Sequence, residues 1–396
     1  MVVLKRMLTL TLLLILAVPL AGCWNRRELN TLGIIGIVGV DAENNGVKTT
    51  FEIIKPAKAS SAGKGGSDSQ GTPTPVKYIQ ASGPTIMETF RESALRFDRR
   101  LFTSQAKGFL FSEELARKGL ATNLDAILRD HEMRLTMHLV IVKDSSAADV
   151  MGIASGINTI PSNYIEDLIK QYYLHSTSVD SNILDFLKAY TGKGINPVVT
   201  VLRKVKKVKI GALESEEYEL SPEGAAVFLK DRLVGFLDGP ETKGYNLVVG
   251  KASGVVTFPT PDRGGTASVE IFKAASKKDV EINGNEIRLK VKITMNGMLD
   301  EQTVGFGPTD PRAVMEMLEQ GASQSIKQEV EHTLLKVQQE YKSDIFGFGQ
   351  VVHRKYPRQW KEMQDNWDEL FSQAAIEVDV ETKITKTGKS LYPVQE

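Results

Sequence analysis

The stretch that decides the fold of the last third of the chain is DPRAVMEMLEQGASQSIKQEVEHTLLKVQQEY, residues 310–341. Asp310 and Pro311 are typical of the N-cap and the first position of a helix. Apolar residues then keep a helical spacing at Val314, Leu318, Ile326, Val330, Leu334, Val337 and Tyr341. Such a helix would be roughly 45–50 Å long. The stripe could also be a coiled-coil seam, but Gly321 and the spacing near 3.6 favour a helix that packs on a sheet.

Strand patterns surround this helix in the sequence. Three runs, Gly254–Phe258, Ala267–Lys273 and Ile287–Asn296, indicate successive antiparallel strands, and Asn283-Gly284 is a turn signal. A last strand is expected at Ala375–Thr385. We therefore predict that residues 251–388 form a C-terminal α+β domain, an antiparallel sheet packed with one long helix, followed by a tail at 389–396.

Helix and strand patterns alternate in the preceding part of the chain, which predicts an N-terminal α/β domain over residues 23–200. Strands are expected at Leu32–Asp41, Val47–Ile54, Tyr78–Ala81, Ala106–Phe111 and Thr136–Val142, and helices at Pro84–Asp98, Glu113–Lys118, Leu124–Arg129, Ser162–Tyr173 and Ile183–Ala189. Residues 57–75 are almost all small or polar and predict a flexible loop.

The pattern changes after residue 200, where we predict a β-rich middle region over 201–250. Val198–Ile210 alternates basic with apolar residues, which favours a strand with one solvated face over a lipid or nucleic-acid surface. A hairpin is expected from Ala225–Leu229 and Leu233–Leu237, with its turn at residues 230–232. The fold class is thus α+β, with several mixed α/β domains.

The N-terminus has the pattern of a secretory signal peptide over residues 1–22. Lys5 and Arg6 precede an apolar run from Met7 to Leu16, and Leu20-Ala21-Gly22 leads directly to Cys23, the only cysteine. A lone cysteine in an exported chain cannot form an internal disulfide. We therefore predict Cys23 as the lipid attachment site, with an S-diacylglyceryl group and an N-acyl group, and the membrane as a partner through this anchor. The alternative is an ordinary signal peptide with an incidental cysteine.

Composition agrees with a soluble body on such an anchor. Removal of residues 1–22 leaves 47 basic against 49 acidic residues, a balance that indicates no nucleic-acid partner. With 41% hydrophobic residues, the chain is able to bury sizeable cores.

Searching the sequence for chemistry gives no catalytic, metal or cofactor site, so we expect no enzyme. The five histidines, His131, His138, His175, His332 and His353, lack metal-ligand spacing. Ser104 and Lys107 fit the S-x-x-K motif, and Lys386-Thr387-Gly388 fits K-T-G, two of three marks of penicillin-interacting serine enzymes. The third mark, S-D-N, is absent, and Ser104 precedes a strand pattern where the chemistry needs the start of a helix.

The chain resembles the spore germinant-receptor C-subunit lipoproteins of spore-forming bacteria. Matching stretches extend in order over nearly the whole mature chain: residues 23–30 (CWNRRELN), 36–41, 112–120 (SEELARKGL), 128–134 (LRDHEMR), 227–237, 241–244 (ETKG) and 344–371, the last with Gly347-Phe348-Gly349, Pro357, Trp360, Trp367 and Phe371. Asn25 stands where the family pattern has aspartate, which leaves the acylation site intact.

This resemblance implies a non-enzymatic subunit of a nutrient receptor, lipid-anchored at the outer face of the spore inner membrane. Its partners would be a large membrane subunit and a polytopic permease-like subunit, and the complex would start germination when germinant binds. The alternative from another class is a solute-binding lipoprotein of a membrane transporter. Such proteins have two lobes of parallel βαβ units, whereas the last third here predicts antiparallel strands and one long helix.

Overall fold

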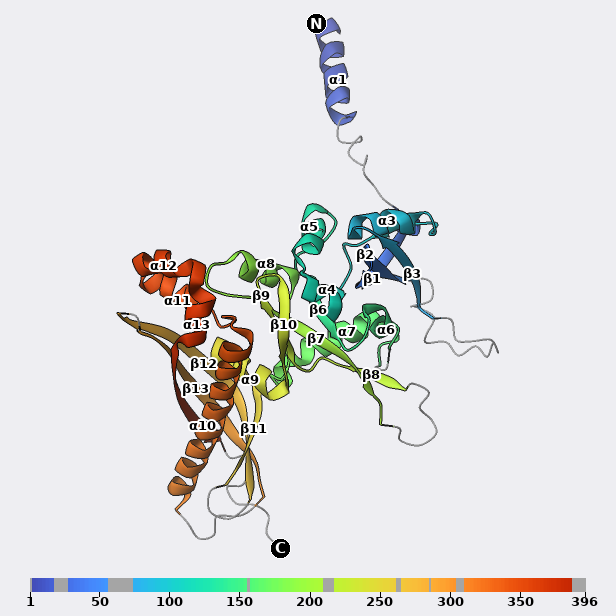
Figure 1. The fold of residues 1–396 in the computed structure, drawn as a ribbon. Coiled ribbons are helices and arrows are strands. Elements are labelled where there is room, and N and C mark those ends of the chain that lie inside the picture. The colour runs from blue at the N-terminus through green and yellow to red at the C-terminus, as the bar shows by residue number, and fades with distance from the viewer. Residues whose placement is uncertain are drawn as a thin grey trace.

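The structure is a computed structural model that describes residues 2–17, 28–55, 74–154, 157–208, 217–260, 265–284, 286–303 and 310–386 (Figure 1). The predicted lipid attachment site Cys23, residues 57–73 of the expected loop and the tail at 389–396 lie outside these ranges. The apolar run near the N-terminus is helical as α1 (Val2–Ala17). Of the described helices, none has the length and hydropathy needed to cross a bilayer.

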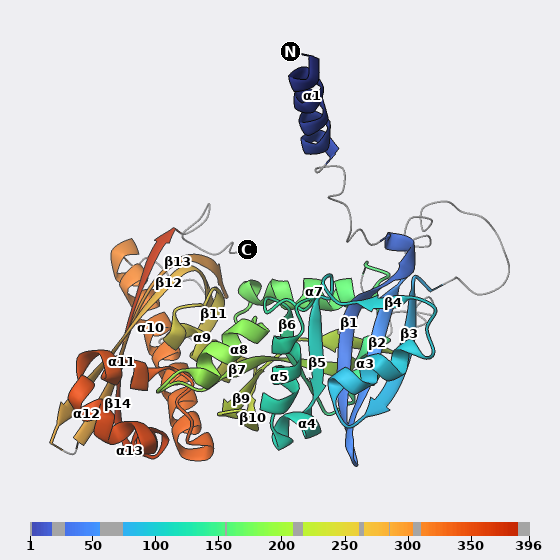
Figure 2. The ribbon, with the colours of Figure 1, turned by 90° about the horizontal axis from the view of Figure 1, so that it is seen from above.

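A ten-stranded mixed sheet contains the first ten strands (Figure 2). Its order is β10-β9-β7-β6-β5-β1-β2-β3, with β4 paired to β1 and β8 paired to β7. The strands are β1 (Leu32–Glu43), β2 (Gly46–Ile54), β3 (Val76–Gly83), β4 (Arg100–Phe102), β5 (Gly108–Ser112), β6 (His138–Lys143), β7 (Val198–Lys206), β8 (Tyr218–Ser221), β9 (Ala225–Leu229) and β10 (Arg232–Leu237). The centre, β1-β5-β6-β7, is parallel, and the strands on either side of it are antiparallel.

Helices cover both faces of this sheet, which explains the continuous apolar runs of its central strands. Phe109 and Phe111 of β5 pack with α3 (Ile86–Ala94), α4 (Glu113–Lys118), α5 (Ala121–Arg129) and α8 (Ile183–Thr191). Leu110, between them, faces the opposite way and packs with α6 (Ala147–Met151) and α7 (Pro161–Lys170). The 3-10 turn η3 (Gln171–Leu174) follows α7.

A shorter helix replaces the one expected over Pro84–Asp98. Helix α3 begins after Thr85, whose side chain accepts a hydrogen bond from the backbone N–H of Glu88, and it ends at Ala94. Phe97 instead packs on Gly33 of β1, where a Cβ atom would lie 2.3 Å from the ring. The approach of this ring to β1 draws the chain out of the helix and toward β4.

The second sheet has the order β11-β12-β13-β14, with β11 (Gly254–Pro259), β12 (Thr266–Asn283), β13 (Glu286–Gln302) and β14 (Ala375–Lys386). The first three strands are antiparallel as expected, and β14 is parallel to β13. The long helix α10 (Pro311–Lys336) continues through one π-helical turn, η4 (Val337–Tyr341). Strands and helices thus confirm the α+β class.

Helix α10 packs on the second sheet with the predicted face. Val314, Leu318, Ile326, Val330 and Leu334 are buried in one core with strands β11–β14. Gly321 lets the helix come close to β11, because a Cβ atom there would lie 2.7 Å from the ring of Phe258. The packed helix is therefore confirmed over a coiled-coil seam.

Four further helices lie between or beside the two sheets: α9 (Gly239–Val249), α11 (Phe348–Lys355), α12 (Pro357–Met363) and α13 (Trp367–Gln373), with the 3-10 turn η5 (Gln364–Asn366). The two sheets lie side by side in both views (Figures 1 and 2). Residues 201–250, which the sequence sets apart, supply β8–β10 to the first sheet and α9 to the packing around α10. The domain boundaries at 200 and 250 stay predictions.

Candidate functional site at the N-terminal end of the sheet

The described body begins five residues after Cys23, at Glu28. The 3-10 turn η2 (Leu29–Thr31) follows and leads directly into β1; the backbone N–H of Thr31 donates to the carbonyl of Glu28 at 3.0 Å. Five residues of chain extend at most about 18 Å. A lipid on Cys23 would therefore hold this end of the ten-stranded sheet within about 18 Å of its membrane attachment point.

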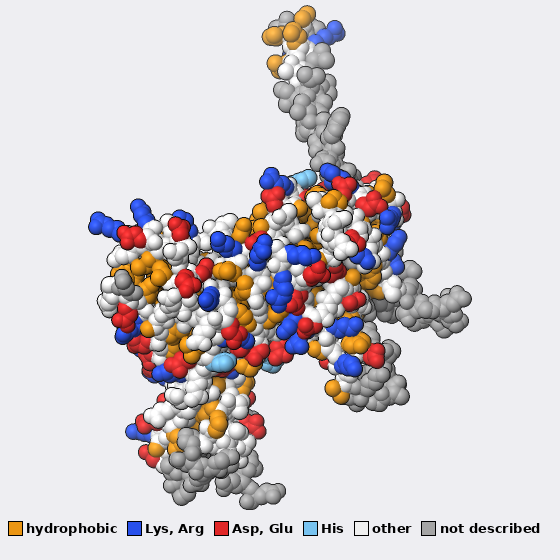
Figure 3. Space-filling model, in the orientation of Figure 1, with side chains coloured by type: hydrophobic (Ala, Val, Ile, Leu, Met, Phe, Trp, Pro, Cys, Tyr) orange, Lys and Arg blue, Asp and Glu red, His pale blue; other side chains and the backbone are white. Residues whose placement is uncertain are grey.

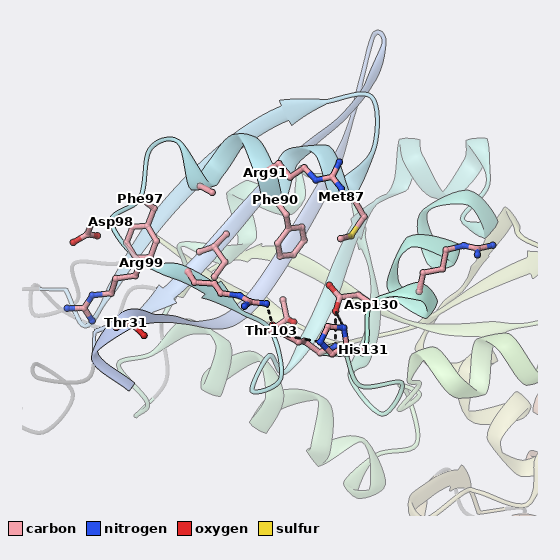
Figure 4. Close-up of a pocket in the computed structure, with 15 residues that line it drawn as sticks. Thr31, Met87, Phe90, Arg91, Phe97, Asp98, Arg99, Thr103, Asp130 and His131 are labelled. Carbon is pink, nitrogen blue, oxygen red and sulfur yellow. Dashed lines mark hydrogen bonds and ion pairs between the residues drawn. The ribbon is translucent and has the colours of Figure 1, made fainter. Parts of the chain in front are cut away.

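A pocket of about 740 Å³ opens at this end of the sheet (Figure 4). Met87, Phe90 and Arg91 come from α3, and Phe97, Asp98 and Arg99 come from the connection between α3 and β4. The wall opposite α3 contains Asp130 and His131, which follow α5. We call this hollow the α3–α5 pocket.

Ion pairs and hydrogen bonds fix the polar wall of the α3–α5 pocket. Arg100 places Nη2 2.8 Å from Oε1 of Glu132, and the backbone N–H of Glu132 donates to Oδ1 of Asp130 at 2.8 Å. His131 projects outward between these carboxylates, 4.0 Å from each. Three of these residues belong to the resemblance stretch 128–134, so that stretch builds one wall of a surface pocket.

The polar lining of this pocket contains both cationic and anionic side chains. Its guanidinium and carboxylate groups can accept a polar group of either sign. None of the described residues that line it is Ser, Cys or Lys. The pocket itself was not predicted from the sequence, since Met87 on one wall and Asp130 on the other are 43 positions apart in the chain. The only signal for it was the resemblance at 128–134.

A second, more apolar pocket of about 490 Å³ lies on the other side of the Phe97–Arg99 segment. Its lining combines apolar residues with three cations, Lys55, Lys77 and Arg99, and with Asp98. Lys77 lies with Nζ 5.2 Å from the centre of the Phe97 ring, a cation–π contact. Leu29 of η2 also lines this pocket, beside the point where the chain leaves toward Cys23.

The residues of the serine-enzyme motif do not come together. Ser104 donates its hydroxyl to the carbonyl of Glu132 at 2.9 Å, and Lys107 forms an ion pair of 2.8 Å with Glu166. Lys386 ends β14 in the other sheet, and Thr387 and Gly388 lie outside the described residues. This arrangement gives Ser104 no adjacent base.

The five histidines lie on separate elements. His138 is 3.0 Å from Asp180, His332 is 3.5 Å from Glu241, and His353 packs on Trp360. Within the described ranges, no group of three or more His, Cys, Asp or Glu side chains is placed to hold a metal ion.

The resemblance stretch 241–244 joins α9 to α10. Glu241 closes a capping box with Asp238, and both of its carboxylate oxygens accept from Nζ of Lys336, at 2.8 and 2.7 Å. Lys243 is 3.6 Å from Glu329, and Gly244 leaves room for Thr333, whose Oγ1 would lie 2.2 Å from a Cβ atom there. Glu241, Lys243 and Gly244 therefore serve the contact between the two helices.

Asp344 organises the resemblance stretch 344–371. It is completely buried, and its carboxylate accepts four hydrogen bonds, from the backbone N–H groups of Phe346 (3.1 Å), Gly347 (2.8 Å) and Gly349 (2.8 Å) and from Nε1 of Trp367 (2.8 Å). Burial raises the pKa of Asp344, and these four donors oppose that effect.

The same residue connects the two sheets. Its carbonyl accepts from the backbone N–H of Asn196, just before β7, at 2.8 Å, and the side chain of Asn196 donates to Asp368 of α13 at 2.8 Å. Ser343 donates its hydroxyl to the carbonyl of Phe228 in β9 at 2.7 Å. The stretch 344–371 is therefore a structural junction between the two sheets.

The fold and its pockets thus define a two-sheet α+β protein with two pockets at its N-terminal end. Two family models match the chain: "Spore germination protein N-terminal domain" over residues 25–204, and "Spore germination B3/ GerAC like, C-terminal" over residues 223–388. The chain belongs to this GerAC-like family of spore germination proteins.

Individual relatives match over nearly their full length. Spore germination protein KC of Bacillus subtilis (strain 168) is 29% identical, with 99% of this chain and 98% of the relative covered. Spore germination protein B3 of the same organism is 24% identical, with 93% and 95% covered. The crystal structure of the GerBC protein is 21% identical and superimposes with a TM-score of 0.56 over 88% of this chain and 96% of that one. This structural likeness shows a common fold.

Proposed function

We propose that this spore germination protein is a lipid-anchored, non-enzymatic subunit of a spore nutrient germinant receptor, needed for the response to germinants. Cys23 carries the S-diacylglyceryl and N-acyl groups and holds the body at the outer face of the spore inner membrane. A large membrane subunit and a polytopic permease-like subunit are its partners in the complex.

The observation that carries this proposal is the position of Cys23. It follows a signal-peptide pattern and precedes, by five residues, a body that matches spore germination proteins over nearly their whole length. A two-chain lipid anchor holds stably in a bilayer, because each buried methylene contributes about 0.8 kcal/mol. The engaged Ser104 and Lys107 support a role in binding and assembly over catalysis.

The test is a detergent pull-down of the tagged chain from spore membranes, with Cys23→Ala as the variant and Asn25→Ala as the matched control beside it. The N-terminal peptide is analysed by mass spectrometry for acyl groups, and the spores are scored for germination with nutrients. We expect an acylated Cys23, co-purification of a permease-like protein with its large companion subunit, and loss of the nutrient response for Cys23→Ala alone.

Two results would contradict this proposal. An unmodified Cys23 in the mature protein would remove the anchor. Recovery of an ATP-driven transporter with the chain, together with direct binding of a small solute, would assign the chain to the solute-binding lipoproteins instead.

A further inference from the structure

We propose that the surface around the start of β1 rests directly on an anionic bilayer surface and so fixes the orientation of the body on the membrane. We call it the tether-side surface and define it by Leu29, Lys55, Lys77, Leu95 and Arg99. The inference rests on the proposed function, because acylation of Cys23 is what brings this surface to the membrane.

Two leucines project from this surface into solvent. Leu29 in η2 is 71% exposed, and Leu95, the C-cap residue that follows α3, is 80% exposed. Single exposed leucines are common, but these two stand at the end of the body where the chain leaves toward Cys23. Large apolar side chains at such a position can enter the boundary between lipid headgroups and acyl chains.

The charges beside these leucines complement an anionic surface. Lys55 follows β2, Lys77 lies in β3 and Arg99 precedes β4, yet all three line the same pocket, where Asp98 is the one acidic lining residue described. Lys77 is exposed, and its Nζ lies 5.2 Å from the centre of the Phe97 ring. Figure 3 shows basic and hydrophobic side chains interleaved, with some acidic ones, at the top of the body where the N-terminal segment leaves it.

The segment between Cys23 and the described body is so short that an acylated Cys23 would keep the body next to the bilayer. Only residues 24–27 stand between Cys23 and Glu28, so the attachment point is at most about 18 Å from the described body. In physiological salt, charges attract each other strongly only over about 8 Å. A tether of at most about 18 Å lets the body reach separations inside this range, where the cations at its tether end favour one orientation.

The experiment uses the acylated full-length chain in nanodiscs. Because Cys23 is the only cysteine and its sulfur carries the lipid, Leu95→Cys provides a single site for an environment-sensitive fluorophore. The matched control is Val208→Cys, which is 78% exposed and follows the end of β7, where that strand pairs with β8. Nanodiscs contain phosphatidylcholine alone or with phosphatidylglycerol, and a lipid with a quencher near its headgroup reports contact.

We expect strong quenching of the label at position 95 in phosphatidylglycerol nanodiscs and little at position 208. Salt at 0.5 M should reduce the quenching at position 95, since the attraction is electrostatic. Each cation near an anionic surface favours docking about five-fold, so Lys55→Ser/Lys77→Ser/Arg99→Ser should abolish the difference between the two labels. The control Arg203→Ser/Lys204→Ser/Lys206→Ser removes three cations from β7. It should leave the difference in quenching between the two labels unchanged.

Equal quenching at positions 95 and 208, or quenching that does not depend on phosphatidylglycerol, would overturn the inference. Quenching that appears only after the permease-like subunit is added would assign the surface to a protein partner and also overturn it. Flotation of the nanodiscs separates the two proposals: if the chain floats with lipid but position 95 is not quenched, the anchor stands and the docking fails. If the chain does not float, the anchor itself fails.

Discussion

Trp367 donates a hydrogen bond of 2.8 Å from its indole Nε1 to Oδ2 of the buried Asp344. The two residues lie 23 positions apart and belong to the junction that connects the two sheets. Because the carboxylate also accepts from three backbone N–H groups, it fixes the Gly347-Phe348-Gly349 turn in place. One carboxylate thus holds the first turn of the junction segment.

Replacement of this acceptor should be costly. Asp344→Asn turns half of the acceptor into a donor that faces backbone N–H groups, and we expect it to lower the free energy of unfolding by at least about 3 kcal/mol. Trp367→Phe removes a single donor. The lost hydrogen bond should lower the free energy of unfolding by about 1–2 kcal/mol, in addition to the effect of the smaller ring. Urea unfolding measures both values, and an Asp344→Asn variant as stable as the parent protein would contradict the role of Asp344.

Lys336 should contribute much more to the stability of the fold than Lys327, which lies on the same helix. Lys336→Ala leaves the buried Glu241 without its counter-ion, and we expect a loss of about 2 kcal/mol, below the 3–5 kcal/mol of a fully buried pair because Lys336 is partly exposed. Lys327→Ala breaks a looser, solvent-exposed pair with Glu331 and should cost less than about 0.5 kcal/mol. Equal losses in thermal unfolding would show that the burial of Glu241 is irrelevant.

Gly321→Ala tests the close approach of α10 to β11. Alanine favours a helix over glycine by about 1 kcal/mol, so an open position would gain stability. Here the new Cβ atom would lie 2.7 Å from the ring of Phe258, and we expect a net loss of about 1–2 kcal/mol. Addition of Phe258→Leu should restore part of it. A stabilised Gly321→Ala protein would mean that the helix stands farther from the strand.

A pH dependence should arise at Glu52, which is completely buried in β2. Its Oε2 is 3.1 Å from the hydroxyl of Tyr78, which also lies 2.5 Å from the carbonyl of Met151. The single tyrosine proton cannot serve both acceptors, so a protonated Glu52 is able to donate to Tyr78 while Tyr78 donates to Met151. Burial raises the pKa of Glu52, and hydrogen bonds from Ser162 and Tyr78 oppose it.

The sign of the effect follows from this direction. A carboxyl group whose pKa is higher in the folded state stabilises the fold while it is protonated, and this contribution is lost as the pH rises from the ordinary glutamate pKa through the raised one. Glu52→Gln keeps a neutral side chain at every pH. We expect the variant to match the parent protein near pH 4 and to gain relative stability toward pH 8, measured by urea unfolding. A constant difference between the two proteins would show that the pKa of Glu52 is not raised.

The backbone N–H groups at the edge of β14 should become less protected when the side chains of α10 that accept from them are removed. Glu319 accepts from the backbone N–H of Ile384 at 2.8 Å, and Ser323 accepts from that of Thr382 at 3.0 Å. Unpaired strand edges are sites of association with other chains, and these two side chains cover part of this one. We expect faster hydrogen exchange at Ile384 in Glu319→Ala, with Gln320→Ala on the same helix as the unchanged control. Exchange as slow as in the parent protein would show that another group protects this amide.

Local patterns determined most of the elements. The hairpin of β9 and β10 and the helix α10 match their predicted ranges closely, because turn residues, helix caps and apolar spacing act over a few neighbouring positions. Helix α9 was missed because Gly239 and Pro240 indicate a turn, whereas in the structure the capping box of Asp238 and the ion pair with Lys336 support a helix there. Strand β12 extends past its predicted end. The prediction stopped early because the charged residues Lys277, Lys278 and Asp279 interrupt the alternation of apolar and polar residues that indicates a strand.

The sequence by itself therefore determined the α+β class, the long helix with its buried face, the order of the strands along the chain and the resemblance to spore germination proteins. Only the tertiary structure decided that the strands of residues 198–237 join the first sheet, that β14 runs parallel to β13, and that Lys55, Lys77 and Arg99 meet beside Leu29. The physical reason is distance along the chain. Caps and periodicity depend on neighbours, whereas sheet order, the pockets and the contact between Asn196 and Asp344 depend on residues tens to more than a hundred positions apart.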